Sequence, residues 1–475
     1  MEVSKQAAKP RRGDELELDV EGLAFGGRGV ARSNGYVVFV AGALPGDRVR
    51  AALTKAKRHY AEARAVELVR PSADRVPDRC LHGGEPCPGA PWQGLEYERQ
   101  IEHKQQQVAD ALSRIGGLEG FELDPIEPAV ERWRYRNKLE YSFGLHDGEL
   151  ALGFHARGRW DVVVDVDDCQ LASEPNNRAR NELRRWARSQ GIPPYDRRSR
   201  DGVLRNLVVR EGRRTGQVQT RLVTSPATFA RPPVDLHTVI EGPSGGTEGP
   251  TGVLGEENLA EEVRGLRLRI SPLAFFQTNT EMAERLYGVA AEYAGLTGAE
   301  RVFDLYCGIG TIGLTLASRA GEVWGLEAVE PAIADADHNA RANGVDNARF
   351  VVADARLGVR PLVERAGRPD VVVVDPPRSG MSKKVVRRVI ECDAPRIVYV
   401  SCNPTTLAPN AAQLASAGYR LRRVRPVDMF PQTPHIECVA VLERSQTRSN
   451  RTRERGRKRT GDVSAAEREQ RIRAE

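Results

Sequence analysis

The sequence has few of the features that mark a secreted or membrane-bound protein. Its 475 residues include seven cysteines, an odd number scattered along the chain, which does not fit a framework of disulfides. No apolar run approaches the ~20 residues of a spanning helix, and no apolar segment follows the basic start MEVSKQAAKPRRG. These absences argue against a disulfide scaffold, a membrane anchor and a signal peptide. We therefore expect a cytoplasmic protein whose thiols are free, metal-bound or catalytic.

Charge of one sign does not dominate either, since 71 Lys and Arg residues stand against 65 Asp and Glu residues and the net charge is +6. The basic excess gathers in residues 446–475, which are rich in arginine and almost without apolar side chains. That composition predicts a disordered basic tail. Such a tail is either merely solvated or an arm that binds phosphate groups whatever the nucleotide sequence, and both interpretations stay open.

Three patterns divide the remaining chain, as its length suggests at roughly 150 residues a domain. Residues 1–70 show short alternating strands between Gly-rich turns, which predicts a small β-barrel of the kind that binds oligonucleotides. Residues 71–265 predict an α+β region with two helices, three consecutive strands and a hairpin, and residues 241–258 are typical of a low-complexity loop. In residues 266–445 strands alternate with helices, so an α/β fold with a mainly parallel sheet is expected.

The first strand of the α/β region runs into the Gly-rich turn of DLYCGIGTIGLTLA, where Gly308, Gly310 and Gly313 let the backbone approach a ligand. Glu327 ends the next strand, where a carboxylate is able to bind both hydroxyls of a ribose. The turn alone fits a dinucleotide or an adenosyl ligand. The fourth strand, VVVVDPPRSG, decides between them, because the Asp-Pro-Pro motif that begins at Asp375 is a mark of methyltransferases that use S-adenosylmethionine.

The fifth strand, RIVYVSCNP, stops at Cys402 because Pro404 cannot continue a central strand. A free cysteine is more often core filler than a reactive group. The position favours reactivity, since open α/β sheets bind ligands at the carboxyl ends of their strands. Arg378 follows the Asp-Pro-Pro motif, where enzymes that methylate amino groups of bases usually have an aromatic residue. Methylation at carbon instead requires a group that makes the carbon nucleophilic, which a cysteine thiolate provides.

Five blocks occur in the order found in a known family: SPLAFFQTN, DLYCGIGT, DPPRSG, VSCNP and FPQTPHIECVAVLER. From about Gly13 to Glu443 the chain resembles the RNA uracil-5 methyltransferases. The resemblance implies a Rossmann-like methyltransferase domain, S-adenosylmethionine as the cofactor, and formation of 5-methyluridine in transfer or ribosomal RNA. It also implies that the N-terminal barrel is a TRAM domain, an RNA-binding module, and that the partner is RNA, with no membrane and no obligate protein partner.

In this family the cysteine of the SCNP block is the nucleophile and the glutamate of the H-x-E-x-V block is the base, which correspond to Cys402 and Glu437. The thiolate adds to carbon 6 of a flipped-out uracil, carbon 5 takes up the methyl group, and the base removes the carbon-5 proton so that the thiolate leaves. A thiol of pKa ~8.5 is mostly protonated at neutral pH, so the site is expected to lower the pKa of Cys402. Six residues fall on positions that contact the cofactor: Gln277, Tyr306, Thr311, Glu327, Asp354 and Asp375. At one of these, Thr311, relatives often have asparagine.

Many members of that family bind a four-iron, four-sulfur cluster through C-x5-C-G-G-C and a distant fourth cysteine. Here Cys80 and Cys87 are separated by one extra residue, Ala90 stands in place of the third ligand, and Cys169 matches the fourth. A cuboidal cluster is held by four ligands. We therefore predict that the chain holds no iron–sulfur cluster and no metal, although His82 or an external thiol is chemically able to substitute.

The segment WRYRNKLEYSFG interleaves Trp133 and Tyr135 with Arg134, Arg136 and Lys138, a mixture that suits base stacking and phosphate contact. A half-buried strand with one solvated face explains it equally well. The family resemblance favours contact with RNA.

Three other functions fit part of the sequence. A nicotinamide-dependent dehydrogenase explains the Gly-rich turn but not the Asp-Pro-Pro motif, Cys402 and Glu437 together. A non-catalytic RNA-binding protein explains the barrel and the tail but not those two residues. A cytosine-5 RNA methyltransferase also uses a cysteine nucleophile, but it typically has a second cysteine after the proline of the fourth-strand motif, where this chain has Arg378.

Overall fold

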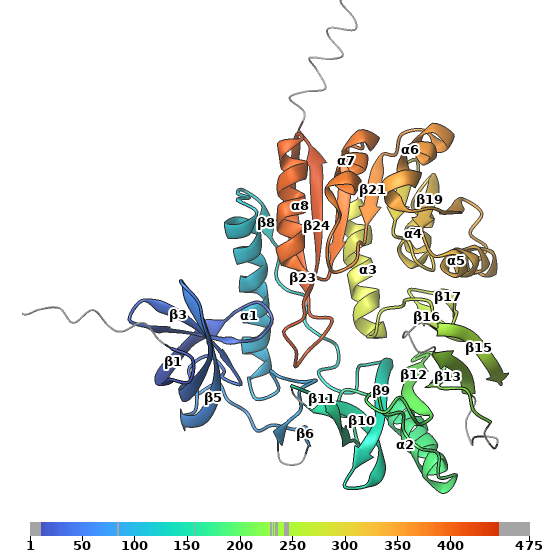
Figure 1. Cartoon of the computed structure of the whole chain (residues 1–475). Helices are drawn as coiled ribbons and strands as arrows, with labels where there is room; N and C mark the ends of the chain where they lie inside the picture. The colour runs from blue at the N-terminus through green and yellow to red at the C-terminus, as the bar shows by residue number, and fades with distance from the viewer. Residues whose placement is uncertain are drawn as a thin grey trace, which may run out of the picture.

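The computed structural model describes residues 11–445 except 83–84, 157, 229, 231, 233–235 and 242–246. The predicted basic tail, residues 446–475, lies outside the described residues. Figure 1 shows a barrel at one end of the molecule, an α/β layer on the opposite side, and a second sheet below that layer. None of the helices in the described part of the chain combines the length and the apolar composition needed to cross a membrane.

The N-terminal barrel is closed and contains five strands in the order β1-β2-β3-β5-β4. Its strands are β1 (Glu15–Leu23), β2 (Gly29–Ser33), β3 (Tyr36–Ala41), β4 (Arg48–Ala56) and β5 (Tyr60–Arg70). Alternate residues point inward, so that Val38 and Val40 are fully buried in a small core of their own. Alternation in the sequence had predicted this barrel, and the prediction is confirmed.

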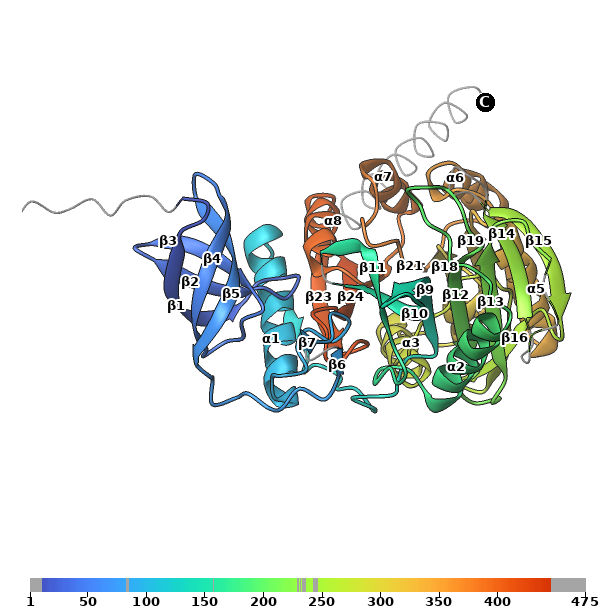
Figure 2. The same cartoon turned by 60° about the horizontal axis from the view of Figure 1, so that its bottom comes forward.

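A long helix separates the barrel from the α/β layer (Figure 2). A short β6–β7 pair (Leu81–His82 and Glu85–Pro86) precedes this helix, α1 (Tyr97–Asp110). One π-helical turn, η1 (Ala111–Ile115), follows the helix, and Gly116 caps it. Val108 and Leu112 pack into the same core as Leu407 of α8 (Pro404–Ser416), so the helix belongs structurally to the α/β layer.

The central region contains a seven-stranded sheet in the order β11-β10-β9-β12-β13-β14-β15. Its elements are β9 (Lys138–His146), β10 (Glu149–Ala156), β11 (Arg159–Asp165), α2 (Glu174–Ser189), β12 (Leu204–Glu211), β13 (Val218–Thr224), β14 (Leu236–Glu241) and β15 (Thr247–Leu254). The three predicted strands, the helix capped by Ser173 and the hairpin are all present. The predicted loop over residues 241–258 is partly wrong, because β15 pairs with β14, and a neighbouring strand outweighs a composition rich in glycine.

The α/β layer is an eight-stranded sheet in the order β20-β19-β18-β21-β22-β24-β23-β8. Its strands are β18 (Arg301–Leu305), β19 (Glu322–Glu327), β20 (Ala348–Val352), β21 (Val371–Val374), β22 (Arg396–Ser401), β23 (Tyr419–Val427), β24 (Glu437–Arg444) and β8 (Glu122–Leu123). Its helices are α3 (Thr280–Ala294), α4 (Thr311–Ala317), α5 (Glu330–Ala342), α6 (Ala355–Ala366), α7 (Lys383–Cys392) and α8; a hairpin of β16 (Leu259–Val263) and β17 (Leu266–Ile270) precedes α3. The strands from β20 to β22 are parallel, and β24 is antiparallel to β22.

Helices cover both faces of this sheet. Val373 belongs to the core that includes Leu286 of α3, whereas its neighbour Val372 belongs to the core that includes Val389 of α7. All four residues of β21 are buried, as expected for a central parallel strand. The predicted fold class, an α/β domain with an N-terminal barrel and a central α+β region, is confirmed.

The last strand of the α/β sheet comes from the N-terminal half of the chain. β8 pairs in parallel with β23, and Asp124, directly after β8, is buried. The Asp124 carboxylate accepts hydrogen bonds from Arg423 (2.8 Å), Arg425 (2.9 Å) and the Tyr293 hydroxyl (2.5 Å). The first and last thirds of the chain therefore share one sheet.

Candidate active site at the carboxyl ends of the parallel strands

The Gly-rich turn after β18 needs its glycines for steric reasons. The backbone of Gly310 has φ +84°, and a Cβ there would lie 2.9 Å from Phe350. Gly313 donates its backbone N–H to Asp304 at 2.8 Å, and a Cβ on Gly313 would lie 2.9 Å from the same carboxylate. The turn is thus fixed by left-handed backbone and by close packing.

Glu327, at the end of β19, bridges this turn and the next loop. Its carboxylate accepts backbone hydrogen bonds from Gly308 (3.3 Å), Ala328 (2.7 Å) and Val329 (3.0 Å). The carboxylate is therefore held beside the Gly-rich turn. This geometry fits recognition of a ribose diol next to an adenosyl group.

Asp354 and Tyr306 lie on the same edge of the sheet. Asp354 caps α6 by accepting from the backbone N–H of Arg356 at 2.8 Å, and it also pairs with the guanidinium of that residue. This pairing lowers the pKa of Asp354. Burial raises the pKa of Tyr306 to about 12, and the nearby Asp354 carboxylate adds to the increase. Tyr306 also has a left-handed backbone, with φ +66°.

Two acidic groups lie in the interior of the site without a cation to balance them. Burial raises the pKa of Asp375, directly after β21, to about 7, and Asp304 adds to this increase. The pKa of Asp304 is also raised to about 7, chiefly by burial, and its Oδ1 atom has no hydrogen-bond partner among the described residues. A positive charge placed at this edge of the sheet would lower both pKa values.

The strand register brings Cys402 and Glu437 together. β22 and β24 are antiparallel with Ser401 opposite Cys438, so the next step of the ladder places Cys402 opposite Glu437. Residues opposite each other in such a pair lie about 4.5–5.5 Å apart at Cα and project to one face. Of the seven cysteines, all within the described part, six are buried and Cys402 is partly exposed. Its exposure favours a reactive thiol over core filler.

The charges around Cys402 and Glu437 contradict the prediction that the site lowers the pKa of Cys402. The pKa of Cys402 is raised to about 12 by burial and by the negative charges of Glu437 and Asp375, although Arg378 partly opposes the shift. The expectation that the site lowers the pKa of Cys402 is therefore wrong for the protein without bound ligands. Burial and Asp375 also raise the pKa of Glu437 well above its usual range. Without ligands, the Cys402 thiol is therefore neutral at physiological pH, and the raised pKa of Glu437 favours the protonated form of its carboxyl group.

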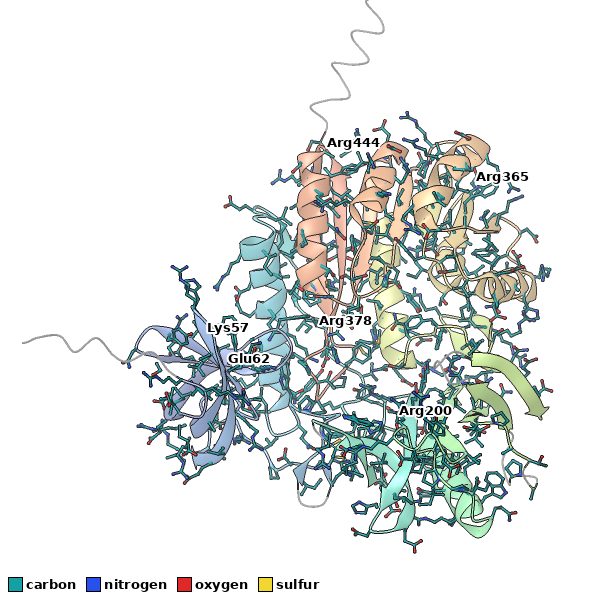
Figure 3. All side chains as sticks on the ribbon, viewed as in Figure 1. Lys57, Glu62, Arg200, Arg365, Arg378 and Arg444 are labelled. Atoms are coloured by element: carbon teal, nitrogen blue, oxygen red, sulfur yellow. The ribbon has the colours of Figure 1, made fainter. Side chains whose placement is uncertain are left out.

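Arg378 is a site residue whose role the sequence did not reveal. Figure 3 shows it at the centre of the molecule, where the sheet faces the central region. Its backbone carbonyl accepts from the Asn403 amide at 3.1 Å, which ties the loop after β21 to the residue next to Cys402. Its side chain is exposed, and no carboxylate among the described residues forms a salt bridge with it. An exposed guanidinium beside the thiol suits contact with an RNA phosphate.

Gln277 and Thr311 are both buried. The backbone carbonyl of Gln277 accepts from the Asn137 amide at 3.0 Å, which links the segment before α3 to the central region. Thr311 begins α4, and its hydroxyl lowers the pKa of Tyr287 by hydrogen bonding. Burial and the charges of Asp375 and Glu437 raise the pKa of Tyr287. Tyr287 therefore lies near Thr311, Asp375 and Glu437, a position that the sequence did not predict.

The loop between β23 and β24, which leads to Glu437, is anchored by α1. Lys104 and Asp428 form a fully buried ion pair at 2.5 Å, and Lys104 also donates to the carbonyl of Phe430 at 3.0 Å. Gln100 and Gln432 exchange two hydrogen bonds of 2.9 Å. Gln432 has φ +67°, a left-handed conformation that this pair helps to hold. Nothing in the sequence predicted this anchor.

We expect Lys104→Met to lower the free energy of unfolding by about 3–5 kcal/mol, because the buried Asp428 carboxylate would lose its cation. Denaturant titration followed by circular dichroism measures the loss. Arg99→Met on the same helix is the control, since Arg99 is exposed and its ion pairs contribute about 0–1 kcal/mol. A loss below about 1 kcal/mol for Lys104→Met would contradict the anchor.

The interleaved basic and aromatic segment is mainly structural. Tyr135 is fully buried and donates to the carbonyl of Pro431 at 3.1 Å. Arg134 is bound to the Asp168 carboxylate, and the Arg136 guanidinium lies 5.8 Å from the ring of Phe430. The prediction that Tyr135 stacks on RNA is wrong, because the loop between β23 and β24 covers this residue, which local alternation in the sequence does not reveal.

The predicted degenerate cluster motif is assembled in space. Cys80, Cys87 and Cys169 are buried in one core with Ala90, which is fully buried. Three thiols and an alanine methyl do not supply the four ligands of a cuboidal cluster. The donor set therefore does not fit an iron–sulfur centre of the family's type.

Two family models match two separate segments of the chain. The model of the tRNA (uracil-5-)-methyltransferase family matches residues 254–445, which contain the site described above. The TRAM domain model matches residues 9–66, which contain most of the closed barrel.

Similar proteins extend over nearly the whole chain. A protein of Halalkalibacterium halodurans, named an uncharacterized RNA methyltransferase, is 38% identical over 457 residues, which cover 93% of this chain and 99% of the relative. A protein of Chlorobaculum tepidum with the same description is 38% identical over 482 residues, covering 94% and 99%. Both matches therefore extend over nearly the full length of both proteins.

A solved structure is also similar. It is the tRNA (uracil-54, C5)-methyltransferase of Pyrococcus abyssi in complex with S-adenosyl-L-homocysteine, with a TM-score of 0.72 and 29% identity. The match covers 90% of this chain and 100% of that one. With the barrel, the sheet and the grouped carboxylates, these matches show that the chain is an S-adenosylmethionine-dependent enzyme that acts on RNA and belongs to the RNA (uracil-5-)-methyltransferase family.

Proposed function

We propose that the enzyme methylates carbon 5 of one specific uridine in transfer or ribosomal RNA through a covalent bond between Cys402 and uracil, which Glu437 resolves. The observation that supports the proposal is the register of β22 and β24, in which Ser401 lies opposite Cys438, so that the partly exposed Cys402 and the buried Glu437 flank the last pair of the ladder. A nucleophile and a base on one face of a sheet are the two groups that methylation at carbon 5 requires.

We propose that six residues hold the cofactor: Gln277, Tyr306, Thr311, Glu327, Asp354 and Asp375. The chemistry of the site fits this ligand, because the Glu327 carboxylate suits a ribose and the uncompensated acids suit a positive charge. When bound, S-adenosylmethionine supplies an electrophilic methyl group on a positively charged sulfur. A positive charge held near Asp375 would lower the pKa of that acid and of Cys402, which would favour the thiolate when the cofactor is bound.

The reaction then depends on the protonation states of Cys402 and Glu437. The Cys402 thiolate adds to carbon 6 of uracil, and the electron pair moves so that carbon 5 becomes nucleophilic. After carbon 5 is methylated it carries one proton too many, and the Glu437 carboxylate removes it while the carbon–sulfur bond breaks. Glu437 must be ionised at that step, so the charge that lowers the pKa of Cys402 must also lower that of Glu437.

RNA binding follows from the barrel and from the exposed Arg378 beside the thiol. Phosphate contacts of this kind position a nucleic acid without selecting a base. A target uridine in folded RNA must be flipped out to expose carbon 6 to Cys402. We further propose that the enzyme acts in the cytoplasm, because all seven cysteines are free thiols.

Mass spectrometry of nucleosides tests the function directly. Transfer RNA and ribosomal RNA from cells with and without the gene are digested separately, and 5-methyluridine is quantified in each. We expect its loss from one RNA class and its return when the gene is restored. Loss of 5-methylcytidine instead would support the cytosine-5 alternative, and unchanged nucleosides in both classes would contradict methylation of either RNA.

We expect Glu327→Ala to weaken binding of S-adenosylhomocysteine about 10- to 100-fold, because hydrogen bonds to a charged group contribute about 1.5–3 kcal/mol. Isothermal titration calorimetry measures the affinity. Glu330→Ala is the matched control, since Glu330 is an exposed acid on the following helix. Equal affinities for Glu327→Ala and the unmodified protein would remove Glu327 from the cofactor site.

A further inference from the structure

Three side chains that bind metals converge before α1. The sulfur atoms of Cys80 and Cys87 and the Nε2 atom of His82 all lie within 4.8 Å of one another. The distance from Cys80 Sγ to His82 Nε2 is 3.5 Å. In a tetrahedral zinc site, bonds of about 2.3 Å to sulfur and about 2.0–2.1 Å to nitrogen give a sulfur–nitrogen separation of about 3.6 Å. The observed spacing matches that of a zinc site.

A third thiol, that of Cys169 in the central region, lies in the same core. Its side chain is buried there together with Cys80 and Cys87. The backbone on both sides of the group is held in place. Gln93 exchanges hydrogen bonds of 2.7 and 2.8 Å with the backbone of Cys80, and Asn177 does the same for Cys169 at 2.9 and 3.1 Å.

We propose that Cys80, His82, Cys87 and Cys169 bind one Zn²⁺ ion in a tetrahedral structural site. Four such donors match the Cys₃His set of structural zinc sites. Ala90 is fully buried at the position of the family's third cluster cysteine, and the ligand atoms of Cys80, His82 and Cys87 lie close enough together to share one ion. The ion joins the segment before α1 to the turn before α2. The proposal rests on no step of the methylation reaction.

Metal analysis of the intact protein tests the site. Protein purified without chelators and without oxygen is measured for zinc and iron by mass spectrometry. We expect about one zinc per chain and iron far below stoichiometry. Reconstitution with Co²⁺ after zinc removal should give the sulfur-to-cobalt absorption of a tetrahedral thiolate site. About four irons per chain, or folded protein without bound zinc, would overturn the proposal.

Variants identify the ligands. His82→Ala and Cys87→Ser are expected to retain less than about a tenth of the zinc after dialysis against a weak chelator, as loss of a ligand weakens binding strongly. Cys392→Ser is the control, because Cys392 is buried in α7, in a different core. Full zinc in His82→Ala, or a disulfide between Cys80 and Cys87 in the native protein, would refute this ligand set. If the variants do not fold, the metal content of the unmodified protein still tests whether the site binds zinc.

Discussion

Cys402→Ala is expected to reduce the formation of 5-methyluridine by on the order of 10⁴-fold or more, the scale seen when a nucleophile is removed from an enzyme. Carbon 5 of uracil has little nucleophilic character until a group adds at carbon 6. In this site the group must come from the thiol opposite Glu437, the one cysteine of the seven that is partly exposed. The measurement is transfer of a labelled methyl group to unmodified RNA at saturating cofactor.

Two comparisons make this result specific. Cys392→Ala removes a thiol that is fully buried in α7 and should leave the rate within about twofold of the original. Cys402→Ala should also bind S-adenosylhomocysteine normally, because the cofactor residues are unchanged. A rate for Cys402→Ala within about tenfold of the original would make Cys402 core filler and exclude the covalent mechanism.

Glu437→Gln is expected to stop the reaction one step later. The side chain keeps its size but can no longer take the carbon-5 proton, so the methylated uracil should stay bonded to Cys402. Loss of the Glu437 charge also removes one of the interactions that raise the pKa of Cys402, so addition of the thiolate should not slow. Turnover is expected to fall by about 10²–10⁴-fold, the usual contribution of a general base.

The trapped species is detected by denaturing gel electrophoresis. Glu437→Gln incubated with RNA and S-adenosylmethionine should give a slower band that ribonuclease removes. Cys402→Ala combined with Glu437→Gln should give no such band. If Glu437→Gln releases methylated RNA at the original rate, another group acts as the base. If it forms no adduct while Cys402→Ala is inactive, Glu437 is needed before or during addition.

Much of the architecture was predictable because its signals are local. Alternation with Gly-rich turns predicted the barrel, and alternation of strands and helices predicted the α/β layer. Gly310 and Gly313 could be assigned to a tight turn because only glycine fits beside Phe350 and Asp304. Cys402 and Glu437 lie close together because Cys402 directly follows β22 and Glu437 begins β24.

What the sequence did not predict depends on distant partners. The pKa of Cys402 is set by Glu437 and Asp375, which come from two other strands, and by burial that no motif reports. The Lys104–Asp428 pair joins residues 324 positions apart. Tyr135 sits in a segment that looks solvated until the loop before Glu437 covers it. In each case the charge or burial of one residue is decided by a segment far along the chain.

The parallel pairing of β8 with β23 also fixes the order in which the protein can be completed during synthesis. A ribosome that adds about 5–20 residues per second needs roughly 16–65 s to go from Lys104 to Asp428, 324 positions later. Until then the nascent chain holds the barrel and α1, but Val108 and Leu112 lack the α8 surface that buries them. The newly made helix therefore exposes apolar side chains and an unpaired lysine for that interval. The barrel has a core of its own, whereas α1 and β8 reach their final packing only after α8 and β23 have left the ribosome.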